Sequence, residues 1–214
     1  MPKFDEIVSL GHRCTSQIAI NYVSNNSNCI GETSPFSWVN NFNANNIHQV
    51  IETNFTTYLS NIEKEPYHLD INLPLKSSHG FGHYDLSDKR VQESFERKIH
   101  RFMNTLNNDN RNILFVYINE DFLYNEDYRL YDDRIYEDLK ILHDFIENRY
   151  PKLKFKLFNI AFNEKDNYKN ITNVYYKPKK IISKKDWHEN MSIRSNLENE
   201  FRGDCGQLLL RFIQ

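Results

Sequence analysis

The run NILFVYIN at residues 112–119 is the feature that most constrains the fold. Its apolar residues are almost continuous instead of alternating with polar ones, and its length is that of a single strand. Such a strand is buried on both faces, which is typical of the centre of a parallel sheet. A fold that fits this chain must therefore place helices on both faces of a sheet.

Helices and further strands are predicted on either side of that run. After Asp88, a good helix cap, apolar residues recur at helical spacing up to Leu106, and this is the clearest helix in the sequence. A similar pattern predicts a helix over about 133–149. KFKLFNIAF (154–162) and NVYYKP (173–178) predict two more strands.

The chain opens with a strand that leads into a helix. FDEIVSL (4–10) predicts a buried strand that ends at Gly11, and the apolar residues over 14–23 follow helical spacing. Residues 44–60 predict another helix, and a last one begins at about residue 192. Strands thus alternate with helices along the chain.

This alternation predicts one α/β domain over residues 1–214, with a mostly parallel, doubly wound sheet flanked by helices. No repeat and no Gly/Ser-rich linker divides the chain. Ligands of such sheets sit outside the carboxyl ends of the strands. The turn from Gly11 to Cys14 is predicted to lie at that edge.

Composition excludes several classes of function. The formal net charge of -2 gives no overall positive field for nucleic acid or an anionic membrane, and no apolar stretch has the length of a membrane span. The three cysteines are too few for a disulfide framework. We therefore expect reduced thiols, no cofactor, no nucleic-acid or membrane partner, and a cytoplasmic location, or the host cytosol if the chain is viral.

Cys14 is the candidate nucleophile. A helix N-terminus favours a thiolate through its free N–H groups and its dipole, and His12 and Arg13 add positive potential just before it. Gly11 lets the backbone approach a reacting carbonyl, so the N–H groups from Gly11 to Cys14 are candidate oxyanion donors. The plainer interpretation is that Cys14 is an ordinary small buried residue.

Two pairs of residues are candidates for the base that a thiol needs. The first is His83 with Asp85 in GHYDL, where residues two apart on a strand would face the same way. The second is Asp186 with His188 in DWH, after the last predicted strand. Hydrolases of the SGNH type keep an Asp and a His after their final strand, and the layout here is similar, although their Gly-Asp-Ser block is absent.

A metal site is an alternative to this interpretation. The side chains of His79, His83 and Asp85 have a spacing that could bind an ion with one open position. Gly80 and Gly82 argue against the helix that would fix both imidazoles on one face. No metal is therefore predicted.

The motifs SLGHRC (9–14) and SPFSWVN (34–40) together resemble those of a bacterial and viral domain family described as papain-like cysteine peptidases, whose recurrent patterns are S-L-G-x-x-C and P-F-D-W. The likeness spans about residues 5–190. Ser9, Leu10, Gly11 and Cys14 match the first pattern, and Pro35, Phe36 and Trp38 match the second.

The resemblance departs from the family at two places. Ser37 stands where the family usually has Asp, and Tyr84 separates His83 from Asp85, which the family commonly has adjacent. The resemblance implies a peptidase with Cys14 as nucleophile, His83 as base and Asp85 as the residue that orients it. Ser9, Phe36 and Trp38 join Gly11, His12 and Arg13 as candidate substrate-pocket or oxyanion residues.

Three functions remain open. The first is a thiol-dependent hydrolase or acyl-transfer enzyme acting on peptides. The second is an esterase or a glycan-modifying enzyme in the same crevice, with Asp186 and His188 as partners of the nucleophile. The third is a degenerate binding module, which the loss of the family's Asp at Ser37 makes credible.

Overall fold

The fold was taken from a computed structural model of the chain. The structure describes residues 4–11, 14–39, 43–56, 58–59, 84–85, 87–120, 123, 128–180 and 189–214. Within these ranges the side chains are described as well, except at residues 128–131, where only the backbone is described.

The described residues form a five-stranded sheet, and all of its strand pairs are parallel. Its spatial order is β2-β1-β3-β4-β5, so the chain adds β2 on one side of β1 and β3 on the other. The prediction of a doubly wound parallel sheet is confirmed. The strands are β1 (Glu6–Gly11), β2 (Gly31–Glu32), β3 (Asn112–Tyr117), β4 (Lys154–Ala161) and β5 (Ile171–Tyr175).

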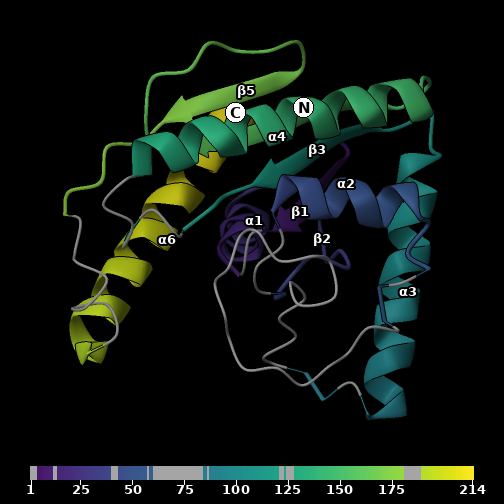
Figure 1. The fold of residues 1–214 in the computed structure, drawn as a ribbon, viewed down its shortest axis with the longest axis horizontal. Helices are drawn as coiled ribbons and strands as arrows, with labels where there is room; N and C mark the ends of the chain where they lie inside the picture. The colour runs from purple at the N-terminus through teal and green to yellow at the C-terminus, as the bar shows by residue number, and fades with distance from the viewer. Residues whose placement is uncertain are drawn as a thin grey trace.

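Five helices in the described part of the chain cover the sheet (Figure 1). One hydrophobic core joins α2, α3 and α4 to one face, and the other core joins α1 and α6 to the opposite face. In Figure 1, α3 and α6 lie at opposite ends of the molecule. The helices are α1 (Thr15–Asn26), α2 (Ala44–Glu52), α3 (Lys89–Leu106), α4 (Tyr128–Arg149) and α6 (Met191–Ile213).

The apolar run that predicted a central strand is β3. Phe115 and Tyr117 belong to the core under α2, α3 and α4, whereas Leu114 and Val116 belong to the core under α1 and α6. All four side chains are fully buried. Because successive side chains point to opposite faces, a strand covered on both sides needs apolar residues at every position.

Several predicted boundaries change in the structure. The helix predicted over 44–60 ends at Glu52, because Asn54 and Phe55 have positive φ angles of 52° and 61° and a helix cannot continue through them. The two-residue strand β2 was not predicted, since it is too short to have a pattern. Asp88 caps α3 as predicted, accepting a hydrogen bond of 2.8 Å from the backbone N–H of Arg90.

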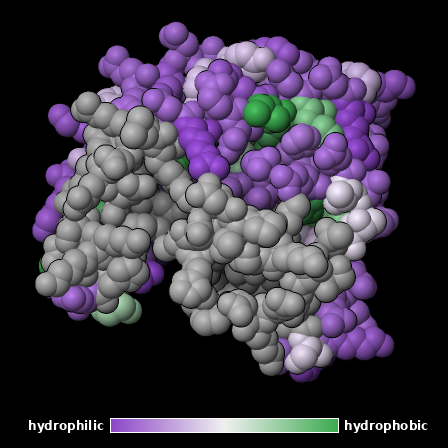
Figure 2. Space-filling view, in the orientation of Figure 1, coloured by the Kyte–Doolittle hydropathy of each residue, from purple (hydrophilic) through white to green (hydrophobic). Residues whose placement is uncertain are grey.

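The surface seen in Figure 2 is mainly hydrophilic where it is described, with a small hydrophobic patch over α4. Ile141 of α4 is 55% exposed. None of the helices in the described part of the chain combines the length and the hydrophobicity that a membrane-spanning segment requires.

Candidate functional site

The turn between β1 and α1 is held tightly against the end of β3. Gly11 has a φ of 95°, a conformation that residues with a Cβ rarely adopt. Its N–H donates to the Ser9 hydroxyl at 3.2 Å, and its carbonyl accepts from the Ser16 hydroxyl. The backbone N–H of Ile118, just after β3, donates to the same Ser16 hydroxyl at 2.8 Å. These bonds fix where α1 begins.

Cys14 lies at the N-cap position of α1, at the switch point where the strand order of the sheet reverses. Its side chain does not cap the helix, and it is partly exposed, whereas Cys29 and Cys205 are buried. In a sheet of this strand order the ligand crevice lies between the carboxyl ends of β1 and β3. Cys14 lies three residues after the end of β1, the first of these strands.

Charged side chains from the segment after β3 and from α6 meet beside this cysteine. Glu120, three residues beyond β3, is only 1% exposed and accepts a hydrogen bond from the hydroxyl of Thr15. Arg202 of α6 binds the Glu120 carboxylate, with its Nη2 at 3.1 Å from Oε2, and lies 3.5 Å from a Glu198 oxygen. The residue that follows Cys14 is thus bonded to a buried ion pair.

Two effects at Cys14 favour the neutral thiol over the thiolate. Burial raises the pKa of the Cys14 thiol, and the negative charge of Glu120 raises it further. The positive charge of Arg202 acts in the opposite direction but does not outweigh them. Burial and the charge of Glu120 thus oppose the thiolate that the helix N-terminus is expected to favour. A base is needed to remove the proton.

The second family motif packs directly under this turn. The Ser34 hydroxyl donates to the Ser9 carbonyl at 2.5 Å, which joins the loop to β1. The Ser37 hydroxyl, fully buried, donates to the side-chain carbonyl of Gln17 in α1 at 2.6 Å and accepts from the Ser34 N–H at 2.9 Å. At the position where the family usually has Asp, this chain has a neutral, structural hydrogen-bond network.

The two predicted pocket aromatics have different environments. Phe36 is fully buried and packs edge-on against Phe102 and Tyr58, so its side chain belongs to the core. Trp38 is partly exposed and has a φ of 66°. Only Trp38 keeps an exposed surface that a ligand could contact.

Asp85 lies at the entry to α3 and is exposed. Its carboxylate accepts hydrogen bonds from the N–H and the hydroxyl of Ser87, at 2.9 Å and 2.6 Å. Its backbone carbonyl accepts from the N–H of Asp88, the cap of α3. His12, Arg13, His79, His83, Asp186 and His188 lie outside the described residues, so both candidate bases remain predictions.

Two residues of the site were missed from the sequence. Glu120 could have been found, since it follows a central parallel strand at the edge where ligands bind. Arg202 gave no such signal, because it lies within a long helix among other charged residues. Only the packing of α6 on α1 brings it to Glu120.

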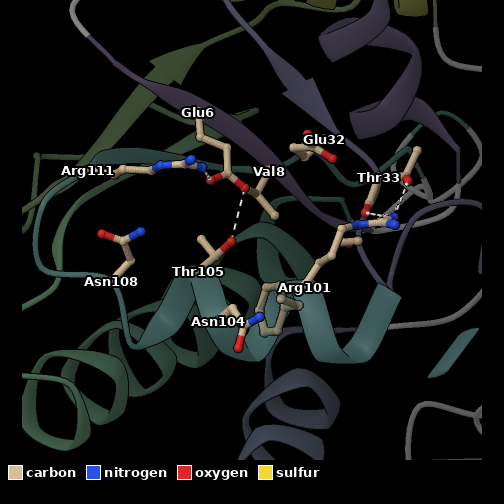
Figure 3. A pocket seen from close by; sticks show the side chains of 11 residues that line it. Glu6, Val8, Glu32, Thr33, Arg101, Asn104, Thr105, Asn108 and Arg111 are labelled. Atoms are coloured by element: carbon tan, nitrogen blue, oxygen red, sulfur yellow. Dashed lines mark hydrogen bonds and ion pairs between the residues drawn. The ribbon is translucent and has the colours of Figure 1, made fainter. Parts of the chain in front are cut away.

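A separate hollow of about 230 Å³ opens between α3 and the β1–β2 side of the sheet (Figure 3). The buried carboxylate of Glu6 faces it and is held by the Thr105 hydroxyl at 3.1 Å and the Arg111 guanidinium at 3.2 Å. At its other end, Arg101 donates to the Thr33 hydroxyl at 3.2 Å. Among the described residues that line this hollow, none is a predicted site residue.

The described residues contain one group of side chains spaced as metal ligands, formed by His143, Asp144 and Glu147. The ammonium of Lys169 already binds both carboxylates, at 2.9 Å and 2.7 Å. A cation at that position would have to displace the lysine. The set therefore fits a metal poorly, and we interpret it as an ion-pair cluster.

The fold and the site together define a doubly wound α/β domain with a partly exposed cysteine at the switch point of its sheet. Residues 5–165 match the model of the family described as "Putative papain-like cysteine peptidase (DUF1796)", and the chain belongs to this family. The resemblance inferred from its motifs is confirmed. Searches of curated proteins and of solved structures each found no match.

Proposed function

We propose that the chain is a thiol-dependent hydrolase that cleaves peptide bonds, with Cys14 as its nucleophile. The observation that carries this proposal is the place of Cys14, partly exposed at the start of α1 and at the switch point of the sheet. The other two cysteines are buried in the core. Membership of a cysteine peptidase family supports the same conclusion.

The proposed reaction begins when the imidazole of His83 takes the thiol proton. The sulfur of Cys14 forms a bond to the substrate carbonyl carbon, the carbon–nitrogen bond breaks, and the leaving amine receives the proton from the imidazole. Water then hydrolyses the thioester, which releases a carboxylic acid and restores the thiol. Because the pKa of the thiol is raised, transfer of its proton to the imidazole is less favourable than at an ordinary cysteine.

The first turn of α1 is the candidate oxyanion site in this reaction. The Cys14 side chain makes no capping hydrogen bond, which leaves the opening N–H groups of the helix without that partner. The backbone N–H of Gly11 already donates to the Ser9 hydroxyl. It is therefore a weaker candidate oxyanion donor than the N–H groups at the start of α1. Asp85 is proposed to orient His83.

The experiment that tests this proposal is hydrolysis of a fluorogenic peptide library by the purified chain. Replacing Cys14 by Ala is expected to abolish turnover, and His83→Ala is expected to lower it by roughly 10²- to 10⁴-fold. His100→Ala is the matched control, because His100 is exposed on α3. Undiminished turnover in the Cys14 variant would refute the proposal.

A second candidate function is hydrolysis or transfer of an acyl ester or a glycan substituent in the same crevice. The all-parallel sheet with order β2-β1-β3-β4-β5 favours it, because the layout is that of sheet hydrolases whose Asp and His follow the last strand. Asp186 and His188 follow β5 in the sequence. On acyl esters, loss of turnover in His188→Ala but not in His83→Ala would select this function.

A third candidate, a binding module without catalysis, follows from Ser37. Its buried hydroxyl joins Gln17 to Ser34 and provides no charge. If the family's Asp served catalysis, this chain lacks that group. Absence of turnover on both peptides and esters, with Cys14 alkylated no faster than Cys29, would favour this function.

A further inference from the structure

The helix α6 begins after residue 165, where the family match ends, yet the charges of its Glu198 and Arg202 act on Cys14. It packs along α1 so closely that a Cβ added to Gly206 would lie within 3 Å of the side chain of Tyr22. One turn earlier along α6, Arg202 reaches the carboxylate of Glu120. The site is therefore assembled from the matched domain and from a helix outside it.

The charges around Cys14 come from two elements in the described part of the chain. Glu120 follows β3, while Glu198 and Arg202 lie one turn apart on α6. Arg194, one further turn away, binds Glu198 at 2.9 Å. Arg202 contacts both carboxylates, and its side chain is only 17% exposed.

Formation of a thiolate at Cys14 would place a negative charge beside these carboxylates. Glu120 accepts a hydrogen bond from Thr15, the residue that follows Cys14. It is buried away from water that could screen its negative charge. Thr15 also lies 3.5 Å from Nε of Arg202. The guanidinium is therefore placed to compensate the buried carboxylate. Its positive charge also lowers the pKa of the Cys14 thiol and so favours the charge that develops on sulfur.

We propose that Arg202 is a positioning residue for Cys14, which holds Glu120 and the first turn of α1 in place and compensates the thiolate when it forms. This inference rests on the proposed role of Cys14 as nucleophile. It assigns a function in the site to a helix that the family match does not include. The fold-level reason is that α6 covers the same face of the sheet as α1.

The test is the pH profile of Cys14 alkylation by iodoacetamide, followed by mass spectrometry of the peptide that contains Cys14. Removing the positive charge by Arg202→Gln is expected to move the midpoint to higher pH and to slow alkylation at neutral pH roughly threefold or more. Removing the negative charge by Glu120→Gln is expected to move the midpoint to lower pH. A merely structural role would not produce shifts of opposite sign.

Three further variants make the result secure. Arg202→Lys keeps the charge and is expected to restore a profile close to that of the unmodified chain. Arg211→Gln makes the same change in the last turn of α6 and is expected to leave the profile unchanged. The double change Glu120→Gln with Arg202→Gln avoids an unpaired buried carboxylate, and its midpoint is expected between those of the single variants.

Opposite shifts in the two single variants, with rescue by lysine, would support the proposal. Shifts in the same direction, or unmoved profiles in variants whose circular dichroism is native, would overturn it. If Arg202→Gln does not fold, Glu120→Gln is compared with the double variant. The alkylation midpoint of the double variant is then expected at a higher pH than that of Glu120→Gln, and equal midpoints would overturn the proposal. Alkylation needs no turnover, so a Cys14→Ala variant that still hydrolyses substrate would refute the proposed function separately.

Discussion

Gly11 determines the direction in which the chain leaves β1. Its φ of 95° lies in the region that favours glycine, and its two backbone groups bond to Ser9 and Ser16. The register between β1 and β3 also shifts between Ser9 and Gly11. A side chain at this position would force the turn away from the geometry that sets Cys14 at the start of α1.

The variant Gly11→Ala is expected to be destabilised by about 1–3 kcal/mol, because a residue with a Cβ is strained at this φ. Urea denaturation followed by circular dichroism measures the loss. Slower alkylation of Cys14 at fixed pH is expected alongside it, since α1 would begin elsewhere. A variant as stable as the parent would show that the turn tolerates a Cβ.

The packing of α6 against α1 depends on a single small residue. At Gly206 a Cβ would lie 2.8 Å from Cγ and 2.9 Å from Cβ of Tyr22, both close to the backbone of α1. At Gly203, three residues earlier, a Cβ would meet nothing within 4 Å. The close approach of α6 to α1 therefore requires a glycine at position 206 but not at position 203.

Replacing these glycines by alanine is expected to have opposite effects on the free energy of unfolding. Gly206→Ala should destabilise the chain by about 1–2 kcal/mol, because overpacking outweighs the gain in helix propensity. Gly203→Ala should stabilise it by about 0.5–1 kcal/mol. Thermal denaturation of the two proteins side by side measures the difference, and equal shifts would contradict the close approach of the helices.

Asp144 joins α4 to the turn that precedes β5. Its carboxylate accepts hydrogen bonds from Tyr168 at 2.8 Å and Lys169 at 2.9 Å, and lies 3.1 Å from Nδ1 of His143. Burial disfavours the charged form, but these hydrogen bonds outweigh it and lower the pKa of Asp144 to about 2. In the folded state the carboxylate of Asp144 therefore stays charged at acidic pH values at which an ordinary aspartate becomes protonated.

This pKa predicts part of the acid sensitivity of the fold. An unfolded aspartate has a pKa of about 3.9, so the stabilisation from Asp144 is complete above that value and is lost as the pH falls toward about 2. Asp144→Asn is expected to lose less stability than the parent between pH 5 and pH 2.5. Urea denaturation at the two pH values measures this difference.

The control for that experiment is Asp109→Asn. Asp109 is exposed before β3 and makes no ion pair within the described residues. Its variant is expected to follow the parent at both pH values. If the Asp144 variant and the control behave alike, the carboxylate of Asp144 does not contribute to folding in the predicted way.

In the molecule as a whole, the sheet lies between two hydrophobic cores that are built from different parts of the chain. The core under α2, α3 and α4 is built by residues up to 171, whereas α6 supplies much of the other. Leu209 and Phe201 of α6 are almost completely buried there. Without α6, one face of the sheet would lose its main cover.

The variant Leu209→Ala tests whether the two cores unfold together. We expect a loss of about 2–5 kcal/mol, because a fully buried leucine leaves a cavity. In a single domain, tryptophan fluorescence and circular dichroism should give coincident transitions that shift together. Gln207→Ala, at an exposed position of the same helix, is the control. Separate transitions would indicate two independent units.

The sequence by itself determined the class of fold and the place of the cysteine. Continuous apolar residues in β3 and helical spacing in α3 follow from local periodicity, so both could be predicted from the chain alone. The strand that ends at Gly11 placed Cys14 at the edge of the sheet where ligands bind. Motif likeness identified the family.

Tertiary structure alone decided what surrounds the thiol. Arg202 is 188 residues from Cys14 in sequence and reaches Glu120 only because α6 packs on α1. The raised pKa of Cys14 likewise depends on burial and on a carboxylate from the segment that follows β3. Periodicity reports which face of an element is buried, but charges meet across elements, and their desolvation is a property of the packed molecule.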